Sequence, residues 1–347
     1  MKSIVLTGGG TIGHTAPHFA IIPKLNFNKI YYIGSKGGIE ESYVTERGLE
    51  FYGINPVKLH RRMTLKNLQI PFKFIKSVCE SKSILSKLKP SVVFSKGGFV
   101  ALPVTIAAKQ LNIPVIIHES DLSIGLANKI ASKFSDKTLT TFDKTATEIK
   151  NGKYVGALIR EELLSSDKNS AFLKYGIKTN KPILLITGGS SGAKAINQVV
   201  LSSLECLTKN FFVFHIVGKN NLTYKKINNY YETEFTDMKF AYKIADVVIS
   251  RAGSNTAFEL ALMKLPTLFI PLPKTSSRGD QIENANYFKQ LNLADVLLQE
   301  NLTSQVLCEK INLLYKNKEL YLNSLKNVNL KIANQEVAEI LNKYWQL

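Results

Sequence analysis

Cysteine is scarce in this 347-residue chain, which contains only Cys79, Cys206 and Cys308. The three lie far apart in the sequence, with no C-x-x-C spacing and no histidine cluster. This pattern excludes a small protein stapled by disulfides and argues against a zinc site. We therefore expect reduced cysteines, as in the cytosol.

Long hydrophobic runs are also missing. No apolar stretch approaches the roughly 18 residues that a membrane-spanning helix needs. Met1, Lys2 and Ser3 lead directly into a strand-like run and a glycine turn, without the apolar region of a signal peptide. The sequence predicts a protein that is neither secreted nor transmembrane.

Acidic residues are few beside basic ones: 27 Asp and Glu against 45 Lys and Arg, for a net charge of +18. Up to Arg160 the chain has 23 basic and 10 acidic residues, and after it 22 and 17. The positive first half favours a polyanionic partner: nucleic acid, an acidic membrane surface or a phosphorylated substrate.

Short apolar runs alternate with helical stretches along the chain. Runs of Val, Ile, Leu and Phe without polar alternation are typical of strands buried on both faces of a parallel sheet. The runs that predict an α/β fold are Ile4–Leu6, Ile30–Ile33, Val92–Phe94, Val115–Ile117, Ile183–Ile186, Phe212–Val217, Val247–Ile249 and Thr267–Ile270.

The strand-and-glycine pattern repeats in the second half. The run 4–10 (IVLTGGG) is echoed by 184–190 (LLITGGS), and 92–98 (VVFSKGG) by 247–253 (VVISRAG). With a length that suits two domains, this predicts two doubly wound, Rossmann-like domains whose glycine turns face one cleft. We predict an acceptor and membrane-facing domain over 1–162, a donor-binding domain over 163–325, and a C-terminal helix over 326–347 that crosses back to the first domain.

Gly8, Gly10 and Gly13 fit the pattern G-x-G-x-x-G between a strand and a helix, which is typical of an anion site. A dinucleotide site would need an acidic residue at the tip of the second strand, but none occurs before Glu40. A G-x-x-x-x-G-K-[ST] loop is also absent. The glycine turns therefore favour phosphorylated ligands, although each taken alone is also explained as a tight turn.

Four side chains are candidates for the chemistry. His14 follows the first glycine loop and suits proton abstraction near neutral pH, or else caps a helix start. Glu119 is a second candidate base. Arg160 could grip a diphosphate and Glu259 could accept ribose hydroxyls, although both are equally well explained as ordinary surface residues.

Six ordered segments resemble the bacterial family that transfers N-acetylglucosamine from UDP-N-acetylglucosamine to undecaprenyl-pyrophosphoryl-N-acetylmuramoyl-pentapeptide in peptidoglycan synthesis. The segments are 7–14 (TGGGTIGH), 95–99 (SKGGF), 188–193 (GGSSGA), 235–238 (FTDM), 250–259 (SRAGSNTAFE) and 280–285 (DQIENA). The resemblance covers nearly the whole chain and implies an inverting glycosyltransferase of the two-domain glycosyltransferase-B architecture. At 120–121 the chain has Ser-Asp where the family commonly has Gln-Asn.

The resemblance also implies roles for individual residues. His14 would be the catalytic base, with Glu119 in reserve. The donor UDP-N-acetylglucosamine would be held by Thr11, Gly13, Arg160, Ser190, Phe235, Ser254, Asn255, Glu259, Gln281 and Asn284. The lipid acceptor's pyrophosphate and muramoyl end would be held by the first loop, with Gly10, Gly97, Gly98, Phe99 and Asn128. No cofactor or metal is implied, and the sequence has no D-x-D motif.

A basic segment suggests where the protein works. Between Lys58 and Lys89 there are nine Lys or Arg and one acid, Glu80, interleaved with apolar residues. Such a segment can dock on an anionic membrane, which predicts a peripheral enzyme at the cytoplasmic face of the cell membrane. Alternatively, Phe74, Ile75 and Val78 form the core-facing side of an ordinary amphipathic helix.

Two other functions stay open. One is another enzyme of the same architecture, such as a UDP-N-acetylglucosamine 2-epimerase or a diacylglycerol glycosyltransferase. The other is nucleic-acid binding, which the basic charge allows but the paired glycine loops and the lack of a helix-turn-helix or RNA-binding signature disfavour. We therefore expect no nucleic-acid partner.

Overall fold

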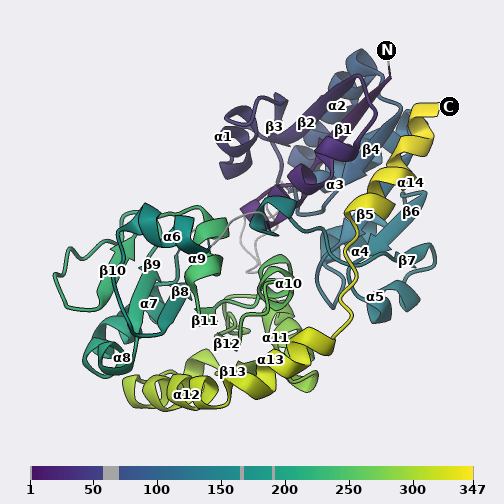
Figure 1. Cartoon of the computed structure of the whole chain (residues 1–347). Helices are drawn as coiled ribbons and strands as arrows, with labels where there is room; N and C mark the ends of the chain where they lie inside the picture. The colour runs from purple at the N-terminus through teal and green to yellow at the C-terminus, as the bar shows by residue number, and fades with distance from the viewer. Residues whose placement is uncertain (1, 58–69, 165–167, 190–191, 347) are drawn as a thin grey trace. The chain divides into compact units, whose positions relative to one another are not determined.

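The computed structural model describes residues 2–57, 70–164, 168–189 and 192–346 of the chain. They form two compact units. The first comprises Met1–Arg160 and Lys331–Leu347, and the second comprises Glu161–Leu330. These boundaries lie close to the predicted ones at 162 and 325, and each unit has its own parallel sheet and helices (Figure 1).

The first unit is built on a seven-stranded parallel sheet with the order β3-β2-β1-β4-β5-β6-β7. Because the strand order reverses between β1 and β4, the loops after these strands diverge and leave a crevice suited to ligands. Both glycine loops of the first half are placed there. The strands are β1 (Ser3–Thr7), β2 (Lys29–Ser35), β3 (Glu50–Ile54), β4 (Val92–Ser95), β5 (Val115–Glu119), β6 (Lys137–Thr140) and β7 (Gly152–Tyr154).

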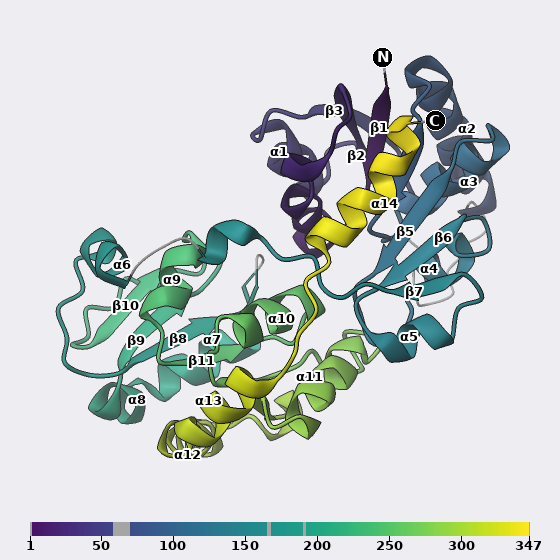
Figure 2. The same cartoon turned by 45° about the vertical axis from the view of Figure 1, so that its right-hand side comes forward.

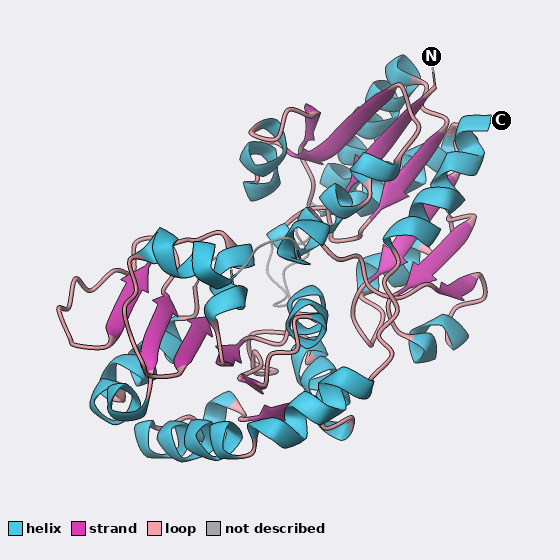
Figure 3. Cartoon of the chain, in the orientation of Figure 1, coloured by secondary structure: helices cyan, strands magenta, loops and turns pink. Residues whose placement is uncertain are grey.

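Helices cover both faces of this sheet. Buried side chains of α2 and α3 pack on one face, and those of α14 pack on the other. Figure 3 shows how helices and strands alternate in both units. The helices of the first unit are α1 (Ile39–Thr45), α2 (Ile70–Leu88), α3 (Ala101–Gln110), α4 (Leu126–Ala131), α5 (Asp143–Thr147) and α14 (Asn334–Gln346), with 3-10 turns η1 (Ile12–His14), η2 (Ala16–Ala20) and η3 (Ile22–Lys24).

The end of the chain belongs to the first unit. Helix α14 lies across the sheet (Figure 2), where Val337 and Leu341 are fully buried. Asn334 anchors its start: its Oδ1 accepts from the Ile159 N–H at 2.9 Å, and its Nδ2 donates to the Ile159 carbonyl at 2.6 Å. Without this helix, one face of the first sheet would lose part of its apolar cover.

Helix α2 presents two different faces. Val78 and Leu85 are buried and Phe74 packs against the core, whereas Phe72 is 77 % and Ile75 59 % exposed. The alternative in which Phe74, Ile75 and Val78 all face the core is therefore wrong for Ile75. Positions 58–69 of the basic segment lie outside the described residues.

The second unit repeats the plan with a six-stranded parallel sheet, in the order β10-β9-β8-β11-β12-β13. Its order reverses between β8 and β11, after which the other two glycine turns follow. The strands are β8 (Ile183–Thr187), β9 (Phe212–Ile216), β10 (Tyr230–Thr233), β11 (Val247–Ser250), β12 (Thr267–Phe269) and β13 (Ala294–Val296). The helices are α6 (Lys168–Tyr175), α7 (Lys194–Ser202), α8 (Leu204–Asn210), α9 (Met238–Ile244), α10 (Ser254–Leu262), α11 (Asp280–Gln290), α12 (Ser304–Lys316) and α13 (Lys318–Asn327), with 3-10 turns η5 (Glu161–Leu164) and η6 (Gln299–Asn301).

The eight apolar runs found in the sequence all fall on strands of these two sheets. The predicted α/β class is confirmed. The apolar runs identify the strands because each strand is covered on both faces of its sheet, and its sequence therefore has no regular polar positions.

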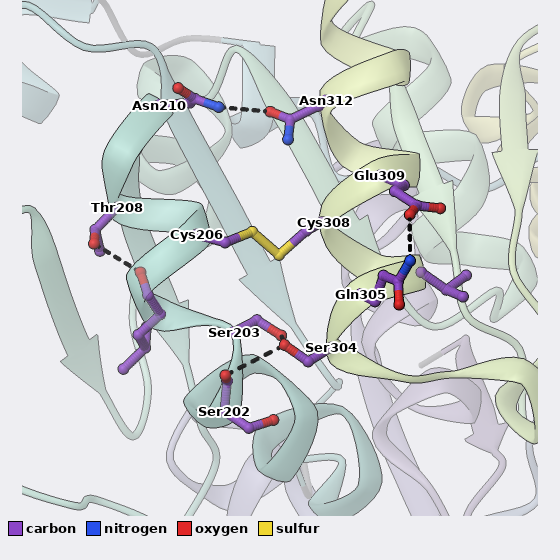
Figure 4. The surroundings of a disulfide bond; sticks show 12 residues. Ser202, Ser203, Cys206, Thr208, Asn210, Ser304, Gln305, Cys308, Glu309 and Asn312 are labelled. Atoms are coloured by element: carbon purple, nitrogen blue, oxygen red, sulfur yellow. Dashed lines mark hydrogen bonds between the residues drawn. A yellow bond between two sulfur atoms is a disulfide. The ribbon is translucent and has the colours of Figure 1, made fainter.

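One disulfide crosses the second unit. Cys206 on α8 is bonded to Cys308 on α12, with Cα atoms 6.5 Å apart (Figure 4). The expectation that all the cysteines are reduced is therefore wrong for this pair, while the exposed Cys79 is free. Sequence spacing could not reveal the pair, because 102 residues separate two helices that pack side by side on one core.

Candidate active site

The first glycine loop is held by a carboxylate of the chain itself. Glu40 is fully buried, and its carboxylate accepts hydrogen bonds from the Gly10 N–H at 3.3 Å and the Ser35 N–H at 2.9 Å. One amide that the sequence assigned to an anionic ligand thus already has an anion beside it. The glycine pattern did not predict this, because Glu40 approaches the loop only through the fold.

His14 has a defined ring orientation. Its Nδ1 lies 3.1 Å from the carbonyl oxygen of Lys96, in the loop after β4. A carbonyl can only accept, so Nδ1 carries the proton and Nε2 of the neutral ring keeps a lone pair. This is the tautomer that a general base acting through Nε2 requires.

The second glycine loop packs directly on the first. Gly98 has a φ of +83°, and a Cβ placed there would collide with the Gly9 carbonyl and lie 3.3 Å from the His14 ring. Gly97, with a φ of +85°, lies against the Asn128 side chain, and the Phe99 ring lies against Gly10. The structure therefore brings together the residues predicted for the acceptor.

Glu119 organises the loop that follows β5. Its Oε1 accepts from the Asp121 N–H at 3.0 Å, and its Oε2 accepts from the Gly125 N–H at 3.0 Å and from Asn128 Nδ2 at 2.9 Å. The residue is only 3 % exposed. With both oxygens engaged, Glu119 fits a loop-ordering role better than that of a base.

Two buried basic side chains were missed by sequence reasoning. Lys96 is 1 % exposed, and its Nζ lies 2.5 Å from His118 Nδ1 and 2.6 Å from Ser120 Oγ. Arg251, at the matching turn of the second unit, is 9 % exposed and donates to the carbonyls of Ile270 at 2.9 Å and Pro271 at 3.0 Å. Each side chain connects the end of its own strand to the end of the neighbouring strand by hydrogen bonds. The signal in the sequence was the similarity of SKGG at 95–98 to SRAG at 250–253, which places a basic residue at the same point of both turns.

The third glycine loop follows β8. Gly189 and Gly192 have φ values of +86° and +71°, and the Gly192 N–H donates to the Gly189 carbonyl at 2.9 Å. Ser190, predicted to hold the diphosphate, lies outside the described residues. The loop leads into α7, whose N-terminus favours negative charge.

Five further donor candidates of the second unit lie on two helices, α10 and α11, which follow β11 and β12 in the chain. On α10, Ser254 and Glu259 are nearly buried, and the hydroxyl of Tyr242 donates to Glu259 Oε2 at 3.5 Å. On α11, Asn284 Nδ2 donates to the Ala252 carbonyl at 3.3 Å, and Gln281 Oε1 accepts from the Leu272 N–H at 3.0 Å. Asn255 follows Ser254 in the first turn of α10.

Other predicted residues lie at edges of the units. Thr11 and Gly13 are exposed in the first loop, and Arg160 is the half-buried last residue of the first segment of unit one. Phe235 follows β10, is 54 % exposed, and its carbonyl accepts from Thr233 Oγ1 at 2.9 Å. Their assignment to the donor stays a prediction, as does the arrangement of the loops around one cleft.

A hollow of about 660 Å³ lies elsewhere in the first unit. It is lined by Ile124, Lys129, Ser132, Lys133, Glu148, Ile149, Lys150 and Asn151, and none of these is a predicted site residue. Within the four described ranges, no group of three or more His, Cys, Asp or Glu side chains is placed to hold a metal ion.

Both halves of the chain match family models. Residues 4–140 match the N-terminal domain of glycosyltransferase family 28, and residues 183–343 match its C-terminal domain. Together with the relatives described next, these matches show that the chain belongs to glycosyltransferase family 28.

Two curated relatives carry the same specific name. A Clostridium botulinum (strain Langeland) protein, 43 % identical over 99 % of both chains, is named UDP-N-acetylglucosamine--N-acetylmuramyl-(pentapeptide) pyrophosphoryl-undecaprenol N-acetylglucosamine transferase. A Clostridium tetani protein with the same name is 41 % identical over 100 % of this chain and 99 % of its own. The resemblance found in the sequence is confirmed at the level of this transferase family.

Solved structures agree with the fold. Acinetobacter baumannii MurG is similar with a TM-score of 0.76 and 26 % identity, covering 99 % of this chain and 100 % of that one. A UDP-GlcNAc 2-epimerase from Neisseria meningitidis, solved with UDP-GlcNAc bound, has a TM-score of 0.70 but 14 % identity, over 100 % of both chains. The second likeness shows a shared architecture and nothing about activity.

Proposed function

We propose that the protein transfers N-acetylglucosamine from UDP-N-acetylglucosamine to undecaprenyl-pyrophosphoryl-N-acetylmuramoyl-pentapeptide, a step of peptidoglycan synthesis. The observation that carries this proposal is the full-length likeness, at 43 % identity, to transferases named for that reaction. The clustered loops at both strand-order reversals support it, because open α/β sheets bind ligands there.

His14 is the proposed catalytic base. Its Nε2 takes the proton of the acceptor's sugar hydroxyl as that oxygen attacks the anomeric carbon of the donor. The bond from this carbon to the UDP oxygen breaks, UDP leaves with the bonding electrons, and the anomeric centre inverts. The hydrogen bond from Nδ1 to the Lys96 carbonyl supports this role, since it orients the ring and leaves Nε2 to accept.

The second unit is proposed to bind the donor. N–H groups of the third glycine loop and the N-termini of α7 and α10 suit the charge that develops on the departing diphosphate, with Arg160 as the guanidinium partner. Glu259 would accept the ribose hydroxyls, and Gln281 and Asn284 would contact the sugar. The first unit's loops would hold the acceptor's pyrophosphate and muramoyl end.

The test is incubation with labelled UDP-N-acetylglucosamine and a lipid-linked muramoyl-pentapeptide, with the product followed by chromatography. Label should move to the lipid only when the acceptor is present. UDP release or sugar epimerisation without acceptor would instead favour the epimerase alternative and contradict the proposal.

The base is tested with His14→Ala. Turnover should fall by about 100-fold or more while UDP-sugar affinity is largely kept, because seven of the ten proposed donor residues lie in the other unit. Unchanged turnover would remove His14 from the base role.

We also propose that α2 docks the enzyme on the anionic cytoplasmic face of the cell membrane, where its lipid acceptor resides. Phe72 and Ile75 point outward, and Lys73 and Lys76 beside them are exposed. The segment's one acid, Glu80, accepts from the Asn55 N–H at 2.8 Å and is held in the first unit's surface. None of the helices described here is long and apolar enough to cross a bilayer.

Vesicle sedimentation tests the docking. Replacing Lys73 and Lys76 by Gln should weaken binding to anionic vesicles roughly 30-fold, at ~1 kcal/mol per cation. Phe72→Ser with Ile75→Ser should weaken it further, whereas Leu320→Ser, which also alters an exposed apolar residue but in the second unit, should not. Equal binding to neutral and anionic vesicles would reject electrostatic docking.

A further inference from the structure

The side chain of Lys96 is fully buried at the predicted acceptor site, and the proposed reaction gives it no role. Its amine is anchored to the end of the neighbouring strand β5, by hydrogen bonds to His118 at 2.5 Å and to Ser120 at 2.6 Å. Burying an amine costs free energy unless its N–H groups make hydrogen bonds. The side-chain position that makes these two bonds is therefore strongly favoured over any other.

The direction of the His118 hydrogen bond follows from its other nitrogen. Nε2 of His118 faces the Gly156 carbonyl at 3.3 Å, and a carbonyl only accepts. Nε2 therefore carries the ring proton, and Nδ1 accepts from the Lys96 amine. Burial keeps the pKa of His118 well below its ordinary value, so the ring stays neutral.

Several other titratable groups face the amine. Burial lowers the pKa of Lys96 to about 7, while Glu119 on β5 and Asp121 after it oppose that shift. His18 on η2 is buried nearby, and desolvation, with Lys96 adding to it, lowers the pKa of His18 to about 3. The cluster thus has an amine among neutral imidazoles, with two carboxylates close by.

The backbone of Lys96 joins this cluster to His14. Its N–H donates to the Thr7 carbonyl at the end of β1 at 2.9 Å, and its own carbonyl accepts from His14 Nδ1. The residue is therefore fixed at its N–H and its amine, and its carbonyl in turn fixes the imidazole. The Gly97 N–H of the same peptide donates to Ser95 Oγ at 3.1 Å. Because the permissive Gly97 and Gly98 follow, the side-chain anchor of Lys96 acts as a further restraint on the rotation of this peptide.

We propose that Lys96 is a positioning residue for His14: its amine, anchored on His118 and Ser120, holds the peptide carbonyl that orients the imidazole and fixes its tautomer. The inference rests on the proposed function, in which His14 is the base. It assigns the buried lysine a part in catalysis without contact to substrate.

A double-mutant cycle on the full-length protein tests the coupling. Lys96→Met keeps an unbranched side chain but removes the amine and with it both hydrogen bonds, and it should lower kcat ~10-fold or more, as misplacement of a catalytic group does. In a His14→Ala background the same substitution should cost less than about twofold, because residues that act as a unit are non-additive. Equal losses in both backgrounds would overturn the proposal.

Matched variants separate positioning from general damage. Ser120→Ala removes one of the two anchors and should give an intermediate loss of kcat. Lys109→Met makes the same exchange at an exposed lysine of the first unit and should leave kcat unchanged. UDP affinity should stay at the wild-type value in Lys96→Met, and its loss would indicate a structural defect instead.

A measurement without turnover keeps the inference separate from the proposed function. Nitrogen-15 NMR of labelled histidines should show His14 protonated at Nδ1 in the wild type and a mixture of tautomers in Lys96→Met and Ser120→Ala. An unchanged tautomer in both variants would refute the positioning role even if the transferase reaction is observed. Failure of the wild type to label the lipid would instead refute the proposed function and leave the tautomer result to decide the geometry.

Discussion

Adding a methyl group at Gly98 should disable catalysis without unfolding the first unit. The new Cβ would collide with the Gly9 carbonyl oxygen and approach the His14 ring to 3.3 Å, so both glycine loops must shift. A displacement of about 1 Å at a catalytic group costs on the order of 100-fold in rate. We therefore expect Gly98→Ala to lower kcat about 100-fold.

Gly37→Ala is the matched control. Gly37 also has a positive φ, +69°, but a Cβ there would meet nothing within 4 Å. Both substitutions therefore carry the left-handed backbone penalty of roughly 1–2 kcal/mol, which lowers Tm by about 2–8 °C in a unit of this size. The clash, and hence the loss of activity, belongs to Gly98 alone.

The assay compares kcat, Tm and UDP affinity of the two variants with the wild type. The expected pattern is a lower Tm in both, a lower kcat only in Gly98→Ala, and wild-type UDP affinity in both. A Gly98→Ala enzyme with wild-type kcat would refute the close packing of the two loops. An equal loss of kcat in Gly37→Ala would show that backbone strain by itself is enough.

Three further outcomes are expected. Reduction of Cys206–Cys308 should lower the Tm of the second unit, because a cross-link across about 100 residues reduces the entropy of the unfolded chain and so stabilises the fold by up to ~5 kcal/mol. Thiol titration before reduction should find only Cys79. Because burial lowers the pKa of Lys96, the unfolded chain binds more protons than the folded one between pH 7 and about 10.5. The stability of the wild type relative to Lys96→Met should therefore rise with pH in that window. A difference in Tm that does not change with pH would contradict the burial argument. Transfer should continue in excess EDTA, since the scheme uses fixed dipoles and a guanidinium on the leaving diphosphate, and a loss of activity restored by Mg²⁺ would contradict it.

Local patterns were enough to predict the framework of the site. Apolar runs marked the buried strands, and the glycines after them marked turns at strand ends. Because the carboxyl ends of parallel strands lie at one edge of a sheet, the loops at residues 8–14 and 95–99 were expected at that edge. The pairing of β1 with β4 then brings them into contact. His14 was placed at that edge for the same reason.

The roles of single polar residues were harder to predict. From the sequence, Glu119 was a candidate base. In the structure both of its carboxylate oxygens accept hydrogen bonds from the loop at 121–128. In the sequence, Glu40 lies too far along the chain to be the acidic residue of a dinucleotide site, and no other role was predicted for it. In the structure its carboxylate accepts a hydrogen bond from Gly10 of the first loop. The role of Glu119 depends on its hydrogen bond with Asn128, which is 9 residues away in the sequence. The role of Glu40 depends on its hydrogen bond with Gly10, which is 30 residues away.

The sequence by itself determined the α/β class, the two repeated halves, the strand-end loops and the family, because these follow from short-range periodicity and ordered motifs. Only the tertiary structure decided that Lys96 and Arg251 are buried anchors and that Cys206 meets Cys308. Hydrogen bonds and burial between distant segments depend on how strands and helices pack, and no local pattern of residue types encodes that packing.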